Sequence, residues 1–171
     1  REGLGWRPSL GRAFPDPLPA DPVAILSGWL DEAAGVVEGD FNAMVLATAT
    51  PGGMPSARVV LCKQIESTPP AAVFYTNYGS RKGRELEANP RAAGVFYWPS
   101  LKRQARIEGT VIRTTVKESD EYFLSRPLLS RVGAIASRQS EPLTSRAALA
   151  ARVMRTAMRP GAAGHRPAEW G

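Results

Sequence analysis

Two adjacent cations stand where the chain is predicted to enter a helix. Arg81 and Lys82 follow a β-type run and a Gly-Ser corner, and Ser80 is a residue type that caps helix N-termini. The free N–H groups of a helix start, the helix dipole and two positive side chains all attract the same anion. The sequence therefore predicts that Arg81 and Lys82 bind a phosphate group.

Other cations lie near the ends of neighbouring β-type runs. Arg58 and Lys63 stand on one run, and Arg103 stands beside Gln104 on another. A single arginine or lysine is usually a solvated surface charge. Because several of them recur near strand ends, the set as a whole favours a small anionic ligand.

The segments that must position these residues show both strand and helix patterns. Asp21 and Pro22 are typical of a helix start, and an apolar stripe at helical spacing follows them. The β-type runs cover residues 43–64, as a hairpin that turns at 51–55, and then 71–76, 91–98 and 103–116, with Gly109 as a bulge or bend. A short helix is expected from Ser80 to Leu86, and three further helical patterns lie between residues 118 and 158.

Consecutive short strands with helices around them predict a mainly β fold, an antiparallel barrel rather than a parallel doubly wound sheet. No GxGxxG motif is present to indicate a dinucleotide fold. The first twenty residues contain four prolines, so residues 1–20 are expected to be an extended arm. With 171 residues, 43% of them hydrophobic, the remainder, 21–171, is expected to form one domain with its own core.

Composition narrows the class of protein further. The chain has one cysteine and one histidine, which excludes an intrachain disulfide and a zinc site built from Cys and His. Cys62 is expected to pack as a small apolar residue. His165 is expected to be exposed and inert. A cytoplasmic protein without membrane-spanning segments is expected, because no apolar run is long enough to cross a bilayer. The net charge of +6 indicates an anionic partner, but the cations are scattered, which disfavours nucleic acid.

Four blocks of the chain together resemble one family of flavin enzymes. They are "RVVLCK", "FYTNYGSRKGRELEANPRA", "RQARIEG" and "YFLSRPLLSRVGAIASRQS", and they occur in the family order between Ala43 and about Ser145. In these blocks the sequence is similar to the pyridoxamine 5'-phosphate oxidase family. The resemblance implies an FMN-binding split β-barrel of antiparallel, Greek-key type, and a homodimer whose two FMN sites lie at the subunit interface.

The resemblance also implies the residues that bind FMN. They are Arg58, Val59, Val60, Leu61, Lys63, Tyr75, Thr76, Arg81, Lys82, Gln104, Gln139 and Ser140. Arg81 and Lys82 would hold the FMN phosphate, in agreement with the prediction from their place at a helix start. Gln139 and Ser140 match positions that the partner subunit contributes to the flavin.

A second set matches the residues that hold the phosphate of a pyridoxal-type substrate. It consists of Lys63, Tyr122, Arg126 and Ser130, two cations and two hydroxyls suited to a dianion. Tyr122 also fits a core position of an amphipathic helix, and Ser130 also fits a helix cap. No general base stands out, so no catalytic side chain is predicted beyond those that orient the substrate.

The function implied is oxidation of pyridoxamine or pyridoxine 5'-phosphate to pyridoxal 5'-phosphate, with O₂ as acceptor and H₂O₂ as product. Two alternatives stay open. "GRELEANPRAAGVFYW" and "IASRQSE" also resemble flavin oxidases of phenazine biosynthesis, which share the fold, and a non-catalytic module that binds flavin or nucleic acid is the other reading. In the family the chain continues past a pair like Trp170-Gly171 into further strands with a tryptophan and an Arg-x-His-x-Arg segment, so we expect residues 21–171 to lack those strands.

Overall fold

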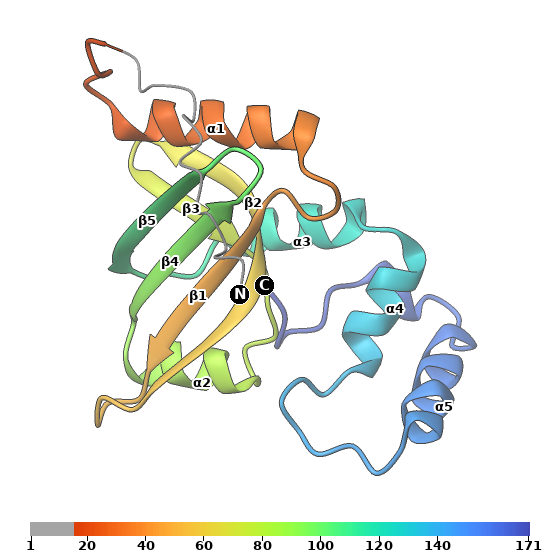
Figure 1. The fold of residues 1–171 in the computed structure, drawn as a ribbon. Helices are drawn as coiled ribbons and strands as arrows, with labels where there is room; N and C mark the ends of the chain where they lie inside the picture. Colours follow the sequence, from red (N-terminus) through yellow and green to blue (C-terminus); the bar gives the residue numbers. More distant parts are fainter. Residues whose placement is uncertain (1–15) are drawn as a thin grey trace, which may run out of the picture.

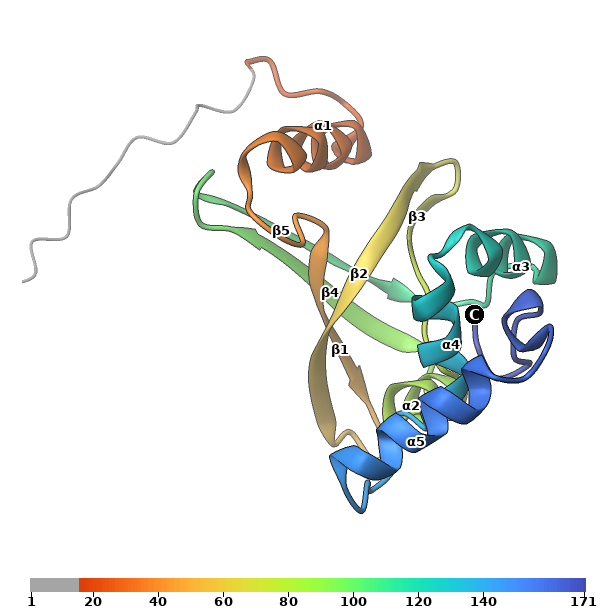
Figure 2. The same cartoon turned by 90° about the vertical axis from the view of Figure 1, so that its right-hand side faces the viewer.

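The computed structural model describes residues 16–171, and its centre is one antiparallel sheet of five strands in the order β3-β2-β1-β4-β5 (Figure 1). The strands are β1 Ala43–Ala49, β2 Pro55–Ser67, β3 Pro70–Phe74, β4 Arg91–Trp98 and β5 Arg103–Thr110. Because β4 returns to lie beside β1 after three consecutive strands, the connectivity is a Greek key. Figures 1 and 2 show a strongly twisted sheet with helices around it, which confirms the mainly β split-barrel prediction.

The helices are α1 Pro22–Val36, α2 Arg81–Ala88, α3 Val116–Ser125, α4 Leu128–Ala136 and α5 Arg146–Ala157, with a short 3₁₀ turn at Ala162–Gly164. Helices α3, α4 and α5 gather on one side of the sheet, away from α1 (Figures 1 and 2). Among residues 16–171, no helix is long and apolar enough to cross a membrane. The same residues contain no cluster of His, Cys, Asp or Glu that could hold a metal ion.

The core lies between α1 and the inner face of the sheet. Asp21 caps α1 by accepting a hydrogen bond from the Val23 N–H at 2.8 Å, as its sequence predicted. Buried members of the core are Leu26, Ala33, Met44, Leu46, Val60, Cys62, Phe96 and Trp98. The prediction that Cys62 packs as an apolar residue is confirmed, since its side chain is 4% exposed.

Arg103 lies at the edge of this core, where it contacts α1, and not in an anion site. Its Nη1 donates to Glu32 Oε2 of α1 at 2.5 Å, and its guanidinium lies 5.0 Å from the centre of the Trp29 ring. Successive strand residues point to opposite faces, so Arg103 faces α1 whereas Gln104 faces the other side. The expectation that Arg103 joins the other cations around a small anion is therefore wrong.

Two strand boundaries and one bulge differ from the sequence prediction. β5 ends at Thr110 and not at residue 116, because its partner β4 is preceded by Pro90, which has no N–H to continue the ladder. β3 ends at Phe74, so Tyr75 and Thr76 lie beyond the strand predicted to contain them.

The predicted bulge at Gly109 is wrong. Gly109 pairs regularly with Ala92, and the irregular register lies in β2, between Cys62 and Gln64.

β2 continues to Ser67, three residues beyond the predicted end of the hairpin, and the other predicted elements are confirmed within about two residues. β1 and β2 form the predicted hairpin, in register from Ala43 opposite Leu61 to Ala49 opposite Pro55. His165 is exposed, as expected. Most of the predicted arm, residues 1–20, lies outside the described residues, and residues 16–20 are exposed and form neither helix nor strand.

Candidate active site

A cavity of about 470 Å³ opens between β2, the segment that follows β3, and helices α3 and α4. Its volume lies in the usual range for small-molecule sites, roughly 300 to 1,000 Å³. Ten predicted site residues line it: Val59, Val60, Leu61, Lys63, Tyr75, Thr76, Tyr122, Arg126, Ser130 and Gln139. The fold therefore brings together residues from three blocks that are far apart in the sequence.

Three aromatic rings form one wall of this cavity. The rings of Tyr75 and Tyr122 are stacked with their centroids 4.0 Å apart, and the Trp170 ring lies parallel to Tyr75 at 5.6 Å. Burial, followed by the charge of Glu118, raises the pKa of Tyr75, so its phenol stays protonated and can donate a hydrogen bond. Tyr122 is thus a wall residue of the cavity and not a core residue of α3.

Trp170 was not predicted as a site residue, and it is held in place by the last residues of the chain. Gly171 exchanges two backbone hydrogen bonds with Thr76, at 2.6 and 2.9 Å. A Cβ atom on Gly171 would lie 1.9 Å from the Tyr78 hydroxyl, so any larger residue here would have to displace the Tyr78 side chain. Arg166 fastens the same segment to α3 through Asp120 Oδ1 at 2.6 Å. Nearly a hundred residues separate Trp170 from Tyr75, so no sequence pattern could pair them.

Arg126 and the start of α4 form an anion-binding arrangement in the cavity. The Arg126 guanidinium lies 4.9 Å from the centre of the Trp170 ring, and its Nη1 is buried with no hydrogen-bond partner among the described residues. Pro127 stands at the N-cap of α4 and makes no side-chain cap. The first N–H groups of α4 are therefore available, and Ser130 adds a hydroxyl to the same cavity. A buried, unpaired guanidinium nitrogen is costly unless a ligand supplies an acceptor.

A second group of cations lies at the start of α2. Ser80 caps this helix by accepting from the Gly83 N–H at 3.2 Å, as predicted. Lys82 is buried, and its Nζ bonds to Gln139 Oε1 at 2.8 Å and to Ser80 Oγ at 3.3 Å. Burial, followed by the charge of Arg58, lowers the pKa of Lys82 to about 8. This buried ammonium has no carboxylate partner among the described residues.

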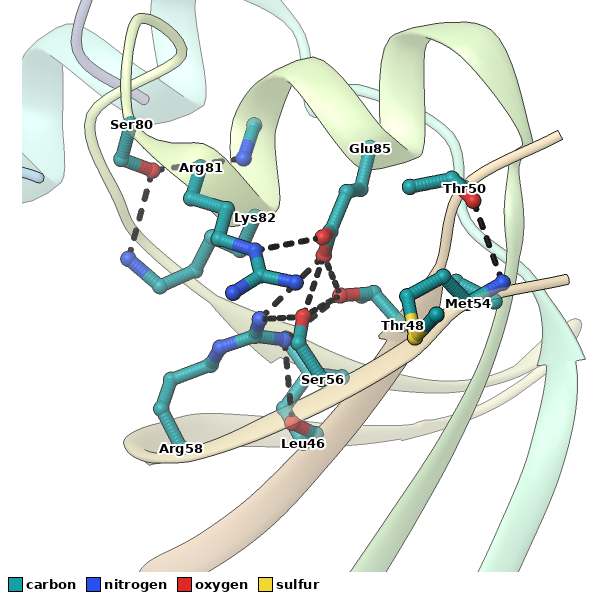
Figure 3. Close-up of polar contacts among 12 residues, drawn as sticks. Leu46, Thr48, Thr50, Met54, Ser56, Arg58, Ser80, Arg81, Lys82 and Glu85 are labelled. Atoms are coloured by element: carbon teal, nitrogen blue, oxygen red, sulfur yellow. Dashed lines mark hydrogen bonds and ion pairs between the residues drawn. The ribbon is translucent and has the colours of Figure 1, made fainter. Parts of the chain in front are cut away.

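A buried glutamate that the sequence analysis did not single out lies at the centre of these cations (Figure 3). Glu85 accepts hydrogen bonds from Arg81 Nε at 2.8 Å and Arg58 Nη2 at 3.3 Å. The hydroxyls of Thr48 and Ser56 each donate to Glu85 Oε2 at 2.5 Å. The Ser56 and Thr48 bonds, followed by the Arg81 bond, lower the pKa of Glu85 to about 2 despite its burial.

Five of the predicted site residues lie outside the cavity wall: Arg58, Arg81, Lys82, Gln104 and Ser140. Lys82 adjoins the cavity through Gln139. Lys82 forms, with Arg58, Arg81 and Glu85, the group called the α2 cluster below. Gln104 lies on β5, separated from β2 by β4 and β1. Gln139 contacts Lys82 of its own chain, although its position was expected to serve the partner subunit.

These observations fit a flavin nucleotide with a phosphate on its side chain. Arg58, Arg81 and Lys82 carry three positive charges and Glu85 one negative charge, so the α2 cluster has the net charge that a phosphate dianion would balance. The adjoining cavity offers an aromatic wall and backbone of β2 to a planar ring system. Arg126, which lines the same cavity and has an unpaired buried nitrogen, indicates a second position for an anion.

Comparison with known families identifies the chain. The model of the family described as pyridoxamine 5'-phosphate oxidase matches residues 30–159. The chain belongs to this family. Relatives named pyridoxine/pyridoxamine 5'-phosphate oxidase include one from Rubrobacter xylanophilus, 53% identical over 88% of this chain and 69% of the relative, and one from Bordetella petrii, 51% identical over 91% and 73%. Family membership makes the protein an FMN-dependent oxidoreductase.

Solved structures agree with this fold. PhzG from Burkholderia lata 383, in complex with tetrahydrophenazine-1-carboxylic acid, is 30% identical with a TM-score of 0.81, over 92% of this chain and 78% of that one. A pyridoxamine 5'-phosphate oxidase-related, FMN-binding protein from Nostoc punctiforme PCC 73102 is 15% identical with a TM-score of 0.67, over 86% and 76%. The second likeness supports the fold alone.

Proposed function

We propose that this protein oxidises pyridoxamine 5'-phosphate or pyridoxine 5'-phosphate to pyridoxal 5'-phosphate, with O₂ as the electron acceptor and H₂O₂ as product. The observation that carries the proposal is Arg126, which lines the cavity beside the uncapped start of α4 and whose buried Nη1 has no hydrogen-bond partner among the described residues. A substrate phosphate would satisfy this nitrogen and the free N–H groups together. The names of the relatives from Rubrobacter xylanophilus and Bordetella petrii support the same substrate class.

In this proposal the chain contributes binding and orientation. Lys63, Tyr122, Arg126 and Ser130 hold the substrate phosphate, which fixes the position of the carbon to be oxidised. Tyr75, Tyr122 and Trp170 form an apolar wall that limits the access of water to one side of the cavity. The hydride acceptor and the route of the electrons to O₂ would be supplied by bound FMN. No side chain is needed as a general base.

The FMN phosphate is assigned to the α2 cluster. Lys82 and Arg81 lie at the first turn of a helix whose N–H groups and dipole favour an anion. Each charge-assisted hydrogen bond between a cation and phosphate contributes roughly 1.5 to 3 kcal/mol. FMN should therefore bind more tightly than riboflavin, which lacks the phosphate.

We also propose that the active form is a homodimer. Gln104 lies three strands away from the cavity of its own chain, so it can serve as an FMN residue only from a second chain. Val45, Val59 and Tyr97 are 43%, 62% and 64% exposed on strands of the sheet. Exposed apolar side chains grouped in this way are typical of an interface between chains.

A second candidate is the oxidation of a dihydrophenazine carboxylate. It is favoured by the similarity to PhzG, whose structure contains a tetrahydrophenazine carboxylic acid. A tricyclic acid without a phosphate would leave the set of Lys63, Tyr122, Arg126 and Ser130 without its dianion. The phosphate ester therefore remains the preferred substrate class.

Peroxide release with different substrates tests the choice. The FMN-loaded protein is supplied with pyridoxine 5'-phosphate, with pyridoxine and with a reduced phenazine carboxylate. We expect oxidation of the phosphate ester, with kcat/KM for unphosphorylated pyridoxine lower by about a hundredfold or more. Turnover of the phenazine alone would replace the proposed function with the second candidate, and no turnover of any substrate would favour a non-catalytic flavin-binding protein.

A further inference from the structure

The α2 cluster contains a carboxylate at a place where a phosphate site should contain only cations and neutral donors. Glu85 is 6% exposed and lies one helical turn after Arg81. A buried carboxylate among phosphate ligands weakens anion binding by like-charge repulsion unless it has a compensating role. Its contacts identify that role.

Glu85 accepts hydrogen bonds from two arginines, Arg58 and Arg81. Arg81 gives its Nε to Glu85 Oε1 at 2.8 Å, while its terminal nitrogens donate to no described residue. Arg58 is held more fully, because Nη2 contacts Glu85 and Ser56 while Nη1 contacts Thr48 and the Leu46 carbonyl. Figure 3 shows the two guanidinium groups side by side at the Glu85 carboxylate.

The contact with Glu85 fixes the orientation of the Arg81 guanidinium. Its side chain is 54% exposed, so without Glu85 the guanidinium would sample many rotamers in solvent. Held through Nε, it presents its two terminal nitrogens to a ligand in a fixed orientation, and these two are free for a bidentate bond to phosphate. The carboxylate itself does not depend on Arg81 alone, because the hydroxyls of Thr48 and Ser56 also bind it.

We propose that Glu85 is a positioning residue for the phosphate of FMN, which acts by orienting the guanidinium of Arg81 through its Nε. This inference rests on the proposed assignment of Arg81 and Lys82 to the FMN phosphate. It predicts that Glu85 matters for the phosphate-bearing cofactor and not for flavin binding in general. A purely structural carboxylate would affect FMN and riboflavin alike.

The test compares the affinities of the purified, flavin-free protein for FMN and riboflavin by quenching of flavin fluorescence. In Glu85→Gln the amide keeps the size of the side chain but brings an NH₂ group among hydrogen-bond donors, so Arg81 is released. We expect Kd for FMN to rise about tenfold, with Kd for riboflavin unchanged. Glu87→Gln is the matched control, because Glu87 is an exposed glutamate of the same helix that pairs with Arg113, and its FMN affinity should stay at the wild-type value.

Two further variants decide between positioning and other roles. Glu85→Asp keeps the charge but shortens the side chain, so it should lose part of the FMN preference; it also serves if Glu85→Gln does not fold. In an Arg81→Ala background, Glu85→Gln should change the FMN affinity less than twofold, because Glu85 acts through Arg81. Equal losses for FMN and riboflavin, an unchanged or tighter FMN affinity in Glu85→Gln, or full additivity with Arg81→Ala would each overturn the inference. A wild-type protein that binds FMN no better than riboflavin would instead refute the assignment of the phosphate site itself.

Discussion

Lys82 gives the site a pH dependence that can be measured. Its pKa is lowered to about 8, first by burial and then by the charge of Arg58, so the free protein loses this positive charge above about pH 8. A bound phosphate dianion favours the protonated amine, and FMN binding above that pH must therefore take up a proton. We expect Kd for FMN to rise about tenfold per pH unit above pH 8, measured by flavin fluorescence.

Lys82→Arg provides the control for this effect. An arginine keeps its charge over the whole range, so the Kd of the variant for FMN should not depend on pH between about 7 and 9. The FMN phosphate is already a dianion there, since the second pKa of a phosphate ester is about 6. Equal FMN affinity of the wild-type protein at both ends of this range would show that Lys82 does not bind the phosphate.

For individual residues, the sequence predicted where the cations Arg81 and Lys82 lie but not which residues contact them. Arg81 and Lys82 could be placed at a helix start because Ser80 and the preceding turn are local signals. Glu85 could not be recognised, because its burial depends on Thr48 and Ser56, whose position under α2 is set by strand register. Long-range contacts of this kind are absent from any local pattern.

Helix α2 is fastened to the sheet by the same buried carboxylate. Thr48 lies on β1 and is 3% exposed, and its hydroxyl donates to Glu85 at 2.5 Å. Thr48→Val keeps the shape but removes this donor, which should lower the free energy of unfolding by about 1 to 2 kcal/mol. Urea denaturation measures the change, with Thr110→Val at the exposed end of β5 as a control expected to have little effect.

The effect of Thr48→Val should also depend on pH. The folded-state pKa of Glu85 is lowered to about 2 from 4.5, so the stabilisation by its ionised form is complete above about pH 4.5 and is lost as the pH falls toward 2. The difference between Thr48→Val and the wild-type protein should therefore shrink in acid. A difference that stays constant down to the acid limit of folding would contradict this account of the contact between helix and sheet.

Element boundaries were predictable where local chemistry sets them. The Asp21 cap, the hairpin turn and the Ser80 cap are local, and all were confirmed. The end of β5 could not be predicted from local chemistry. Val111 lies opposite Pro90, the residue before β4, and only the strand pairing shows that the ladder ends there. The bulge was assigned to Gly109 on composition, whereas the structure has it between Cys62 and Gln64 in β2.

At the scale of the whole molecule, the proposed dimer can be tested through the exposed face of the sheet. Val45 lies on the central strand β1 and is 43% exposed. Val45→Asp introduces a charge that costs little in a monomer but several kcal/mol in a buried interface. Sedimentation should give two chains for the wild-type protein and one for Val45→Asp, with Val36→Asp, at the exposed end of α1, still dimeric.

The resemblance to a family predicted the Greek-key barrel and ten cavity residues, whereas periodicity alone predicted only an antiparallel barrel with helices. Neither predicted that Trp170 would stand beside Tyr75, because that contact depends on how the last residues pair with Thr76.

A dimer that persists in Val45→Asp would require a different interface and would remove the reason to assign Gln104 to FMN.

The most direct test of the proposed function uses Arg126, which lines the cavity and whose buried Nη1 has no partner among the described residues. Arg126→Ala should leave FMN bound, because the α2 cluster is separate from this residue. KM for pyridoxine 5'-phosphate, measured by peroxide release, should rise on the order of a hundredfold, from roughly 2 to 4 kcal/mol of lost binding. Arg155→Ala, on the exposed surface of α5, should behave as wild type. Turnover of the phosphate ester by Arg126→Ala with an unchanged KM would contradict the assignment of this cavity to a phosphorylated substrate.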